Sequence, residues 1–460
     1  MDAPQPTQDA GAAPAAEPNA LFDLGQAQPA ATAARTPPRL RYAHREQAVM
    51  RVCSLEDLIP EDHPVRVVWA HVCALDLSPL LNEIQATEGQ AGAPATDPRI
   101  PMSLWLYATL RGIGSARELD RRCEPQEGEV PFQWICGEVT VNYHTLADFR
   151  TAHGEFLNTL LTQSVAALTH EGLVTLQRVA QDGMKVRASA GASSFRRRKT
   201  LEEHYAQAQE QVKILQQQLQ DDPGAGNRRQ QAARQRTARE RHERLQRALQ
   251  HVQDIEAQKK SKDKEARAST TDVDAHVMKM GDGGFRPAYN VQLATDTQTQ
   301  IITGVEVSTS GGDQGKMAPM VQQHQERYGQ APPEMLADGG FAKKEDIEQV
   351  SPPQGTTTVY TPVQKAKDPQ RDPHTPRADD APAVAEWRQR MASAAAKEIY
   401  KQRAASAECV NALARNRGLY QVRVRSQAKV RAVVLWFVLA HNLVRAATLR
   451  AQQRAEGVTR

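Results

Sequence analysis

Helical periodicity dominates the chain from about residue 40 to residue 170. In PMSLWLYATLRGIGSARELDRRCE, residues 101–124, apolar positions recur at the spacing typical of a helix. Gly112, Gly114 and Ser115 interrupt this pattern and predict a turn between two helices. Ser54 stands where it can cap an earlier helix. We therefore expect an all-helical N-terminal domain over residues 39–170.

From about residue 171 the pattern changes to short apolar runs. Four of them predict strands: LVTLQRVAQDGMKV (173–186), AYNVQLATD (288–296), IITGVEVS (301–308) and EMLADGGF (334–341). A helical pattern lies between the last two runs, and helical periodicity returns from about residue 383. The order strand, strand, strand, helix, strand predicts an α/β domain with a mixed sheet over residues 171–447.

Between the first two predicted strands, residues 195–268 are rich in Gln, Arg and Glu, with apolar residues at helical spacing. DDPGAGN, residues 221–227, breaks this segment, which predicts an inserted antiparallel helical hairpin. A solvated face is the plain explanation for its charges, and contact with DNA or a second copy is the alternative. We also expect an exposed loop over residues 351–385, a disordered tail over residues 1–38 and a second tail over residues 448–460.

Composition narrows the class of protein. The chain of 460 residues has 58 Lys and Arg against 54 Asp and Glu, a near-neutral sum that can hide local basic patches. Five scattered cysteines form no Cys-x-x-Cys pair, which argues against a zinc site and a disulfide framework. The start of the sequence has no apolar leader, and the longest apolar run, Val433–Ala440, is too short to span a bilayer. These features predict a cytoplasmic protein, and a role on DNA predicts association with the nucleoid.

Three acidic residues have contexts that point to chemistry. Asp182 interrupts an apolar strand, Asp338 ends another before two glycines, and Glu408 lies on an arginine-rich helix. A buried charge without a partner is costly, so Asp182 is hard to explain as structure alone. Asp338 is also compatible with an ordinary Asp-Gly turn, and Glu398 competes with Glu408. Carboxylates at strand ends can hold two divalent metals that drive attack on a phosphodiester. If the three converge, the chain cuts and joins nucleic acid.

Several motifs together resemble those of the insertion-sequence DDE transposases, and within them the bacterial branch whose glutamate follows Tyr-x-x-Arg. The motifs are DGMKV, STTDVDAHVMK with GGFRPAYNVQLATD, ADGGF, the Tyr-x-x-Arg…Glu helix and the late AHNL. The resemblance runs from about Arg41 to Arg445. It implies a ribonuclease-H-like catalytic core with two Mg²⁺ ions, for which Mn²⁺ can substitute, and a helical DNA-binding domain. It also implies binding of the element's terminal inverted repeats and of target DNA, strand cleavage and transfer, and a homodimer or larger assembly on the DNA.

The family's functional residues carry over onto six positions: the catalytic and metal-binding Asp182, Asp338 and Glu408, and the DNA-binding Tyr400, Arg403 and Arg415. Two departures stand out. Phe341 replaces a tyrosine that often follows the second aspartate, and four residues instead of three separate Arg403 from Glu408. On a regular helix, residues i and i+4 share a face and residues i and i+5 do not. Either the helix carries a bulge or Arg403 lies off the glutamate's face.

Neighbouring residues have less specific patterns. Asp296 and Asp313 are either supports of the metal ligands or a turn residue and a helix cap. His276 and His441 are best explained as structural histidines, because an oxygen-rich Mg²⁺ site needs no imidazole. Two basic groups suit contacts with DNA: Arg117, Arg121 and Arg122 in the second helix of the predicted helix–turn–helix, and Arg415, Arg417, Arg423 and Arg425.

An active transposase is the leading hypothesis. A catalytically inactive DNA-binding protein derived from a transposase is the alternative, and a nuclease without strand transfer remains open because the same metal site serves both reactions. A structural coiled-coil protein would explain only the inserted hairpin, and the surrounding α/β segments argue against it.

Overall fold

The computed structural model describes residues 52–86, 94–221, 227–258, 265–365 and 370–458. The expected tail over residues 1–38 and the expected start of ordered structure near residue 40 lie outside these residues. Cys53–Arg460 forms one compact unit, and it holds every element described below.

Short helices make up the N-terminal region: α1 (Pro64–Cys73), α2 (Ser78–Leu81), α3 (Arg99–Leu110), α4 (Ala116–Cys123), α5 (Val130–Cys136), α6 (Tyr143–Ala152) and α7 (Gly154–His170). The predicted turn between α3 and α4 is present, with Gly112 at φ +71° and the Ser115 side chain accepting from the Glu118 amide. The prediction for Ser54 is wrong. Its hydroxyl caps a turn by accepting from the Asp57 amide, and α1 begins later, where His63 Nδ1 accepts from the Val65 amide.

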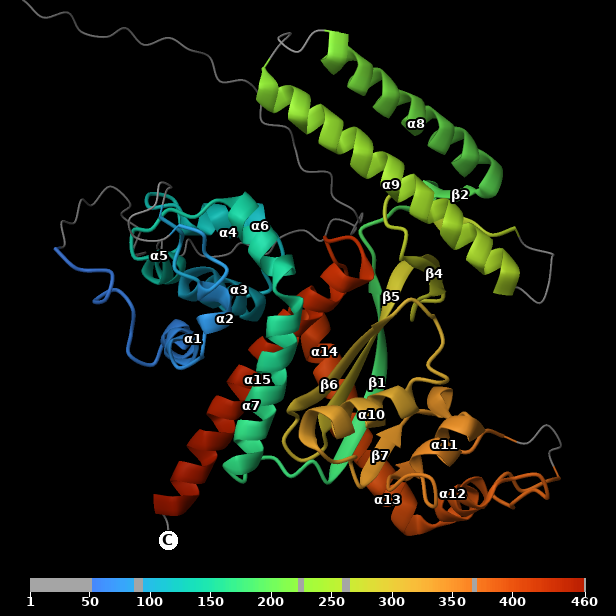
Figure 1. Ribbon diagram of the computed structural model, residues 1–460. Coiled ribbons are helices and arrows are strands. Elements are labelled where there is room, and N and C mark those ends of the chain that lie inside the picture. The colour runs from blue at the N-terminus through green and yellow to red at the C-terminus, as the bar shows by residue number, and fades with distance from the viewer. Residues whose placement is uncertain (1–51, 87–93, 222–226, 259–264, 366–369, 459–460) are drawn as a thin grey trace, which may run out of the picture. The chain divides into compact units, whose positions relative to one another are not determined.

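A mixed sheet follows, with the strands β1 (Arg178–Arg187), β4 (His276–Lys279), β5 (Phe285–Asp296), β6 (Ile302–Ser308), β7 (Glu334–Ala337) and β8 (Thr358–Tyr360). The order is β4-β5-β1-β7-β8, and β6 also pairs with β5. β5 is antiparallel to β1, β4 and β6, whereas β1, β7 and β8 run parallel. This mixed sheet with helices on its faces is the ribonuclease-H-like core expected from the sequence (Figure 1).

The remaining helices are α10 (Met317–Tyr328), α11 (Lys344–Val350), α12 (Pro382–Ala392), α13 (Ala394–Arg403), α14 (Cys409–Asn416) and α15 (Gln427–Val458). One buried cluster joins the N-terminal helices and α15 to β1, β5 and β6, and a second joins α10–α13 to β1, β7 and β8. α15 is long and apolar enough to cross a membrane, but 72% of that stretch is buried inside the protein, against α3, α7 and β6. It is the central helix of the first cluster.

Two of the segments expected to lack regular structure have some. β8 lies inside the expected loop over residues 351–385, with Val359 and Tyr360 buried. A three-residue strand is too short to show a period of two, so the sequence pattern could not reveal it. The expected C-terminal tail over residues 448–460 continues α15 as far as Val458.

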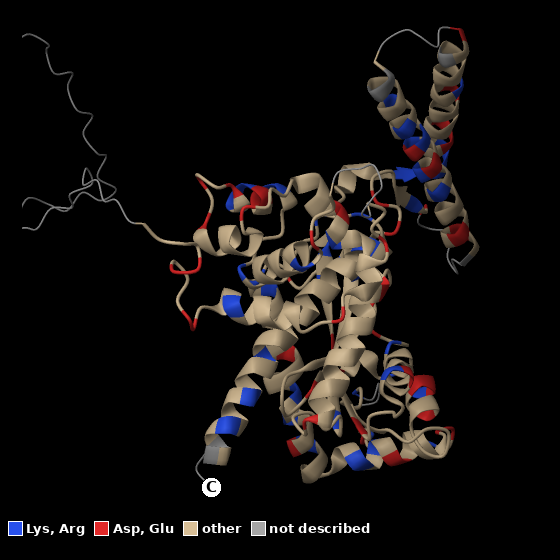
Figure 2. Cartoon of the chain, turned by 60° about the vertical axis from the view of Figure 1, so that its left-hand side comes forward, with Lys and Arg blue, Asp and Glu red and all other residues tan. Residues whose placement is uncertain are grey.

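The inserted hairpin consists of α8 (Arg198–Asp221) and α9 (Arg228–Gln258), and the short strands β2 (Phe195–Arg197) and β3 (Arg267–Ser269) pair at its base. α8 and α9 pack through a small apolar cluster of their own that includes Leu201, Leu245 and Val252. Both helices carry Lys and Arg together with Asp and Glu (Figure 2), with arginine in excess on α9, which fits a solvated face and leaves the contact with DNA open. The helical hairpin predicted from the sequence is therefore present.

Replacing residues 195–269 with two glycines should preserve cooperative folding of the rest of the chain. The Thr270 amide donates to the Ser194 carbonyl at 3.0 Å, so a short linker can join the two ends without strain. The deletion removes the bond between the His251 and His276 rings and the three hydrogen bonds of the Ser269 hydroxyl, with Ser194 and with the Thr271 and Asp272 amides. At about 1 kcal/mol for each bond, the thermal midpoint should fall by roughly 8–16 °C. A circular-dichroism melt measures this, and loss of a single sharp transition would place the hairpin in the core.

Candidate active site

The register of β1 and β7 brings the two aspartates together. These strands are parallel, and Gln181 pairs with Ala337, so Asp182 and Asp338 follow at adjacent positions. Asp182 lies within β1 and its side chain is only 15% exposed, whereas Asp338 begins the loop after β7 and is 40% exposed. The Asp338 Oδ1 atom accepts from the Gly340 amide at 2.7 Å, and the Thr361 hydroxyl donates to the Asp338 carbonyl. The backbone thus fixes both carboxylates at one edge of the sheet.

Glu408 reaches this edge from a helix with a π-helical turn. Between α13 and α14, residues Ala404–Glu408 form a π-helix. One residue is inserted in such a turn, so residues i and i+5 share a face. Arg403 Nη1 accordingly donates to Glu408 Oε1. Of the two alternatives that the four-residue spacing left open, the bulge is present, and it places Arg403 on the glutamate's face.

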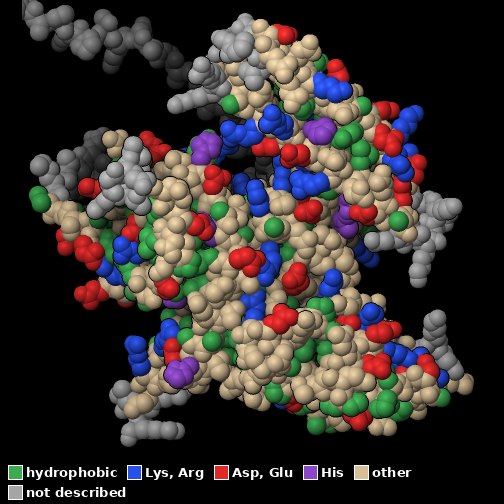
Figure 3. All heavy atoms as spheres, viewed as in Figure 1, with side chains coloured by type: hydrophobic (Ala, Val, Ile, Leu, Met, Phe, Trp, Pro, Cys, Tyr) green, Lys and Arg blue, Asp and Glu red, His purple; other side chains and the backbone are tan. Residues whose placement is uncertain are grey.

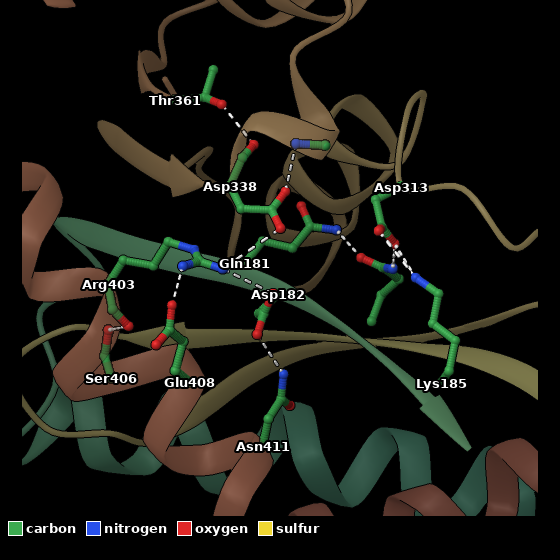
Figure 4. Close-up of polar contacts among 12 residues, drawn as sticks. Gln181, Asp182, Lys185, Asp313, Asp338, Thr361, Arg403, Ser406, Glu408 and Asn411 are labelled. Carbon is green, nitrogen blue, oxygen red and sulfur yellow. Dashed lines mark hydrogen bonds and ion pairs between the residues drawn. The ribbon is translucent and has the colours of Figure 1, made fainter. Parts of the chain in front are cut away.

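Arg403 lies among all three acids (Figure 4). Its Nη2 donates to Asp182 Oδ1 at 3.1 Å and lies 3.8 Å from Asp338 Oδ2, and its Nη1 bonds Glu408. The Arg403 side chain is 10% exposed and the Asp182 side chain is 15% exposed, so the contact between these two residues is largely shielded from water. Asn411, on α14, donates from Nδ2 to Asp182 Oδ2 at 2.8 Å. Each of the three carboxylates therefore directs one oxygen at the same cation.

Burial and charge oppose each other in this cluster. Burial raises the pKa of Asp182, and the Arg403 charge and the Asn411 hydrogen bond lower it only in part. Burial lowers the pKa of Arg403, yet the nearby charges, led by Asp182, outweigh it, and the pKa is raised overall. Burial also raises the pKa of Tyr400, one turn before Arg403. Arg403 is thus a permanent cation in a site that favours positive charge.

Two protein families match the chain on either side of the inserted hairpin. One, described as Transposase domain (DUF772), matches residues 53–152, and the other, described as Transposase DDE domain, matches residues 265–443. Together they cover more than half of the chain, and the second includes Asp338 and Glu408. The chain belongs to the DDE transposases. No curated protein and no solved structure matches it.

The site of this transposase fits the divalent metals that its family uses. Mg²⁺ prefers oxygen ligands, and three carboxylate oxygens face one positive group here. Among the described residues, no three acidic, histidine or cysteine side chains approach closely enough to hold an ion as they stand. The Arg403 guanidinium lies between the carboxylates and separates them. A metal held by these carboxylates would take the place that the Arg403 guanidinium has in this structure.

Sequence reasoning missed a polar cluster next to the transposase site. Asp313 Oδ1 accepts from Asn290 at 2.7 Å and from Gln292 at 2.8 Å, and Asp313 Oδ2 pairs with Lys185 at 3.1 Å. A Cβ on Gly183 would lie 2.5 Å from Asp313 Oδ1, so only glycine fits beside Asp182. Asn290 and Gln292 are polar residues at alternate positions in the otherwise apolar run of β5, and this pattern was the signal in the sequence for the cluster. Asp313 caps no helix, because α10 begins after Lys316 without a side-chain cap.

Asp296 and the two histidines have structural roles. Asp296 Oδ1 accepts from the Gln298 and Thr299 amides in the turn between β5 and β6, which confirms the turn explanation. His441, next to Asn442 on α15, bonds the Gln300 carbonyl, and burial lowers its pKa to about 4. His276 contacts the His251 ring on α9. The late AHNL motif thus fixes the β5–β6 hairpin against α15.

Asn411 is the other residue that sequence reasoning missed, and its position three residues after Glu408 was the available signal.

Arg415 is exposed near the end of α14, and among the described residues it has no ion-pair partner. Arg122 pairs with Glu118 and Glu129, so part of the predicted basic helix is already neutralised.

Proposed function

We propose that the chain is the transposase of a bacterial insertion sequence, from the branch with the Tyr-x-x-Arg…Glu motif, and that it binds the element's terminal inverted repeats and cuts and transfers their strands. The convergence of Asp182, Asp338 and Glu408 on one cation carries this proposal. The proposed partners are the inverted repeats and target DNA, in an assembly of two or more copies on the nucleoid in the cytoplasm. The proposed catalytic domain spans residues 171–447, and the proposed DNA-binding domain spans residues 39–170.

Asp182, Asp338 and Glu408 would hold two Mg²⁺ ions, with Mn²⁺ as a substitute. Bound there, the ions supply an activated water and stabilise the leaving 3′ oxygen. The surrounding residues orient the ligands. Asn411 holds Oδ2 of Asp182 and the Gly340 amide holds Oδ1 of Asp338, so the second oxygen of each carboxylate faces Arg403. In strand transfer, the released 3′-hydroxyl takes the place of water in the same site.

With the carboxylates holding metal, the Arg403 guanidinium would be free to contact the substrate. Arginine matches phosphate in geometry and charge, so Arg403 and Tyr400 would hold the scissile strand beside Glu408. Arg403 would thus have two roles: before DNA binds it neutralises the carboxylates, and after DNA binds it contacts a phosphate.

The test of this function is cleavage of DNA carrying the native element ends by the purified chain, with and without Mg²⁺. We expect metal-dependent nicks at the element boundary and, with target DNA present, joined products. Binding to the ends without any cleavage would favour the inactive DNA-binding protein. Cleavage without joined products would favour a nuclease.

Replacing Arg415 with Ala should slow cleavage about tenfold and leave the thermal midpoint within about 1 °C of wild type, since an exposed arginine contributes little to folding. Arg415 lies two turns beyond Glu408, where it can hold the scissile strand in position for attack. Lys397→Ala, an exposed cation on α13, serves as the control. A lower midpoint with an unchanged rate per folded molecule would make Arg415 a structural residue.

A further inference from the structure

A cavity of about 390 Å³ lies between the N-terminal helices and the segment that follows α14. Its lining includes Gly112 and Gly114 from the α3–α4 turn, Arg150 from α6, and Arg417, Gly418 and Arg423 from the segment after α14. The two regions that line it belong to the two separate family matches. No catalytic role described above uses this cavity.

Arg150 is buried at the wall of the cavity with unused hydrogen-bonding capacity. It is 6% exposed, and its guanidinium packs 4.4 Å from the centre of the Trp105 ring. Its Nη1 donates to the Gly114 carbonyl at 2.7 Å, but its Nε has no hydrogen-bond partner. Burial, with the Arg423 charge, lowers its pKa to about 10, so it is still protonated at neutral pH. A buried guanidinium with a single hydrogen bond is costly, and a negative group in the cavity would offset that cost.

The cavity has an excess of positive charge. Arg417 is half-buried and Arg423 is exposed, and no acidic side chain lines the cavity in the described part of the chain. Within the part of the chain that the structure describes, no ion pair involves Arg150, Arg417 or Arg423. α3 and α14 both end beside the cavity, and each helix end supplies about half a negative charge, roughly one in total against three arginines. About two positive charges remain without compensation.

We propose that this cavity binds a phosphate group of the DNA backbone a few nucleotides from the scissile bond. Arginine clusters recognise phosphate through paired N–H donors, and Arg417 and Arg423 line the cavity together with Arg150. Gly112 and Gly418, at φ +71° and +94°, have a backbone conformation that other residues rarely adopt, and they form the turns at the cavity wall. This inference rests on the proposed function, because it assigns part of the path of the same DNA.

The distance from the active site fits one continuous strand. Arg417 follows Glu408 by nine residues along α14, which is roughly 14 Å at the helical rise. With a base-pair rise of about 3.4 Å, this corresponds to about four base pairs. A phosphate in the cavity would also contact both family-matched regions, so the helical region would help to position DNA in the catalytic site.

Two measurements on the full-length chain test the inference, with Arg417→Gln and Arg423→Gln as variants and Lys429→Gln as the matched control. Lys429 is exposed at the start of α15 and lies outside the cavity lining. The first measurement is affinity for a labelled duplex over a range of salt concentrations. Each cavity variant should bind roughly tenfold more weakly and lower the log–log salt slope by about one, because one phosphate contact is lost. The control should match wild type.

The second measurement is the thermal midpoint with inorganic phosphate against chloride at equal ionic strength. Phosphate should raise the midpoint of wild type and of Lys429→Gln more than that of the cavity variants. Arg150→Lys, which keeps the charge and removes the forked guanidinium donors, should also lose this response.

The outcomes separate the two proposals. A phosphate response with unchanged DNA salt slopes in the cavity variants would assign the cavity to free phosphate and overturn its role in DNA binding. Unchanged slopes and an unchanged phosphate response would overturn the inference entirely. In both cases, normal cleavage by wild type would leave the proposed function intact, whereas failure of wild type to bind or cut DNA would remove both.

Discussion

Asp182→Asn is expected to abolish strand cleavage while leaving affinity for the element ends within about threefold of wild type. A bound metal contributes several kcal/mol to the transition state, so loss of one ligand oxygen should lower the rate by roughly a thousandfold or more. Most DNA affinity comes from Lys and Arg contacts with phosphates, which this change does not touch. Asparagine keeps the shape of Asp182, and its oxygen can still accept the Asn411 hydrogen bond.

Glu408→Gln and Glu398→Gln make a matched pair for the third acid. Glu398 is exposed on the preceding helix and pairs with Lys401, away from the carboxylate cluster. We expect Glu408→Gln to lose cleavage and Glu398→Gln to keep it, measured as single-turnover rates with Mg²⁺.

For Asp182→Asn, normal cutting would refute the catalytic role of Asp182. Loss of binding together with cutting would indicate a folding defect instead.

Arg403→Met should change metal binding and catalysis in opposite directions. Without the guanidinium, Asp182, Asp338 and Glu408 lose the cation that neutralises them, and the metal-free chain should lose about 2 kcal/mol of unfolding free energy. Metal ions then meet no competing charge, so half-maximal stabilisation by Mn²⁺ should need roughly tenfold less metal. Cleavage should fall roughly a hundredfold, because the phosphate contact proposed for Arg403 is lost.

Thermal melts across a Mn²⁺ titration measure the first effect, and single-turnover cleavage measures the second. Lys401→Met is the control, because Lys401 is an exposed cation on the same helix and pairs only with Glu398 among the described residues. If Arg403→Met and wild type need the same metal concentration, the guanidinium does not compete with the ion.

The two strands beside the aspartates could be predicted because Asp182 interrupts one buried apolar run and Asp338 directly follows another. The π-helical turn could also be anticipated, since five steps from Arg403 to Glu408 do not fit one face of a regular helix. The position of Arg403 among three carboxylates could not, because it depends on the register of β1 with β7 and on a side-chain conformation. Neither is encoded in local periodicity.

The cavity around Arg150 shows the same limit. Its arginines come from segments more than 260 residues apart, and the sequence pattern identified only those that follow Glu408. Arg150 looks like an ordinary polar position on α6, and its burial follows from packing on Trp105. β8 was missed for a different reason: its three residues are too few to show the alternation of apolar and polar positions that predicts a strand.

The hairpin between β1 and β5 also affects how the chain folds during synthesis. About a hundred residues separate these paired strands, which the ribosome takes roughly 5–20 s to add. α8 and α9 contact each other locally, and such contacts form quickly compared with pairing between distant strands. Once they have packed, Ser194 and Thr270 are already neighbours, so β5 emerges beside β1 without a costly search. The insertion thereby turns a long step in building the catalytic sheet into a short one, and a slower hairpin would leave β1 unpaired for longer and open to aggregation.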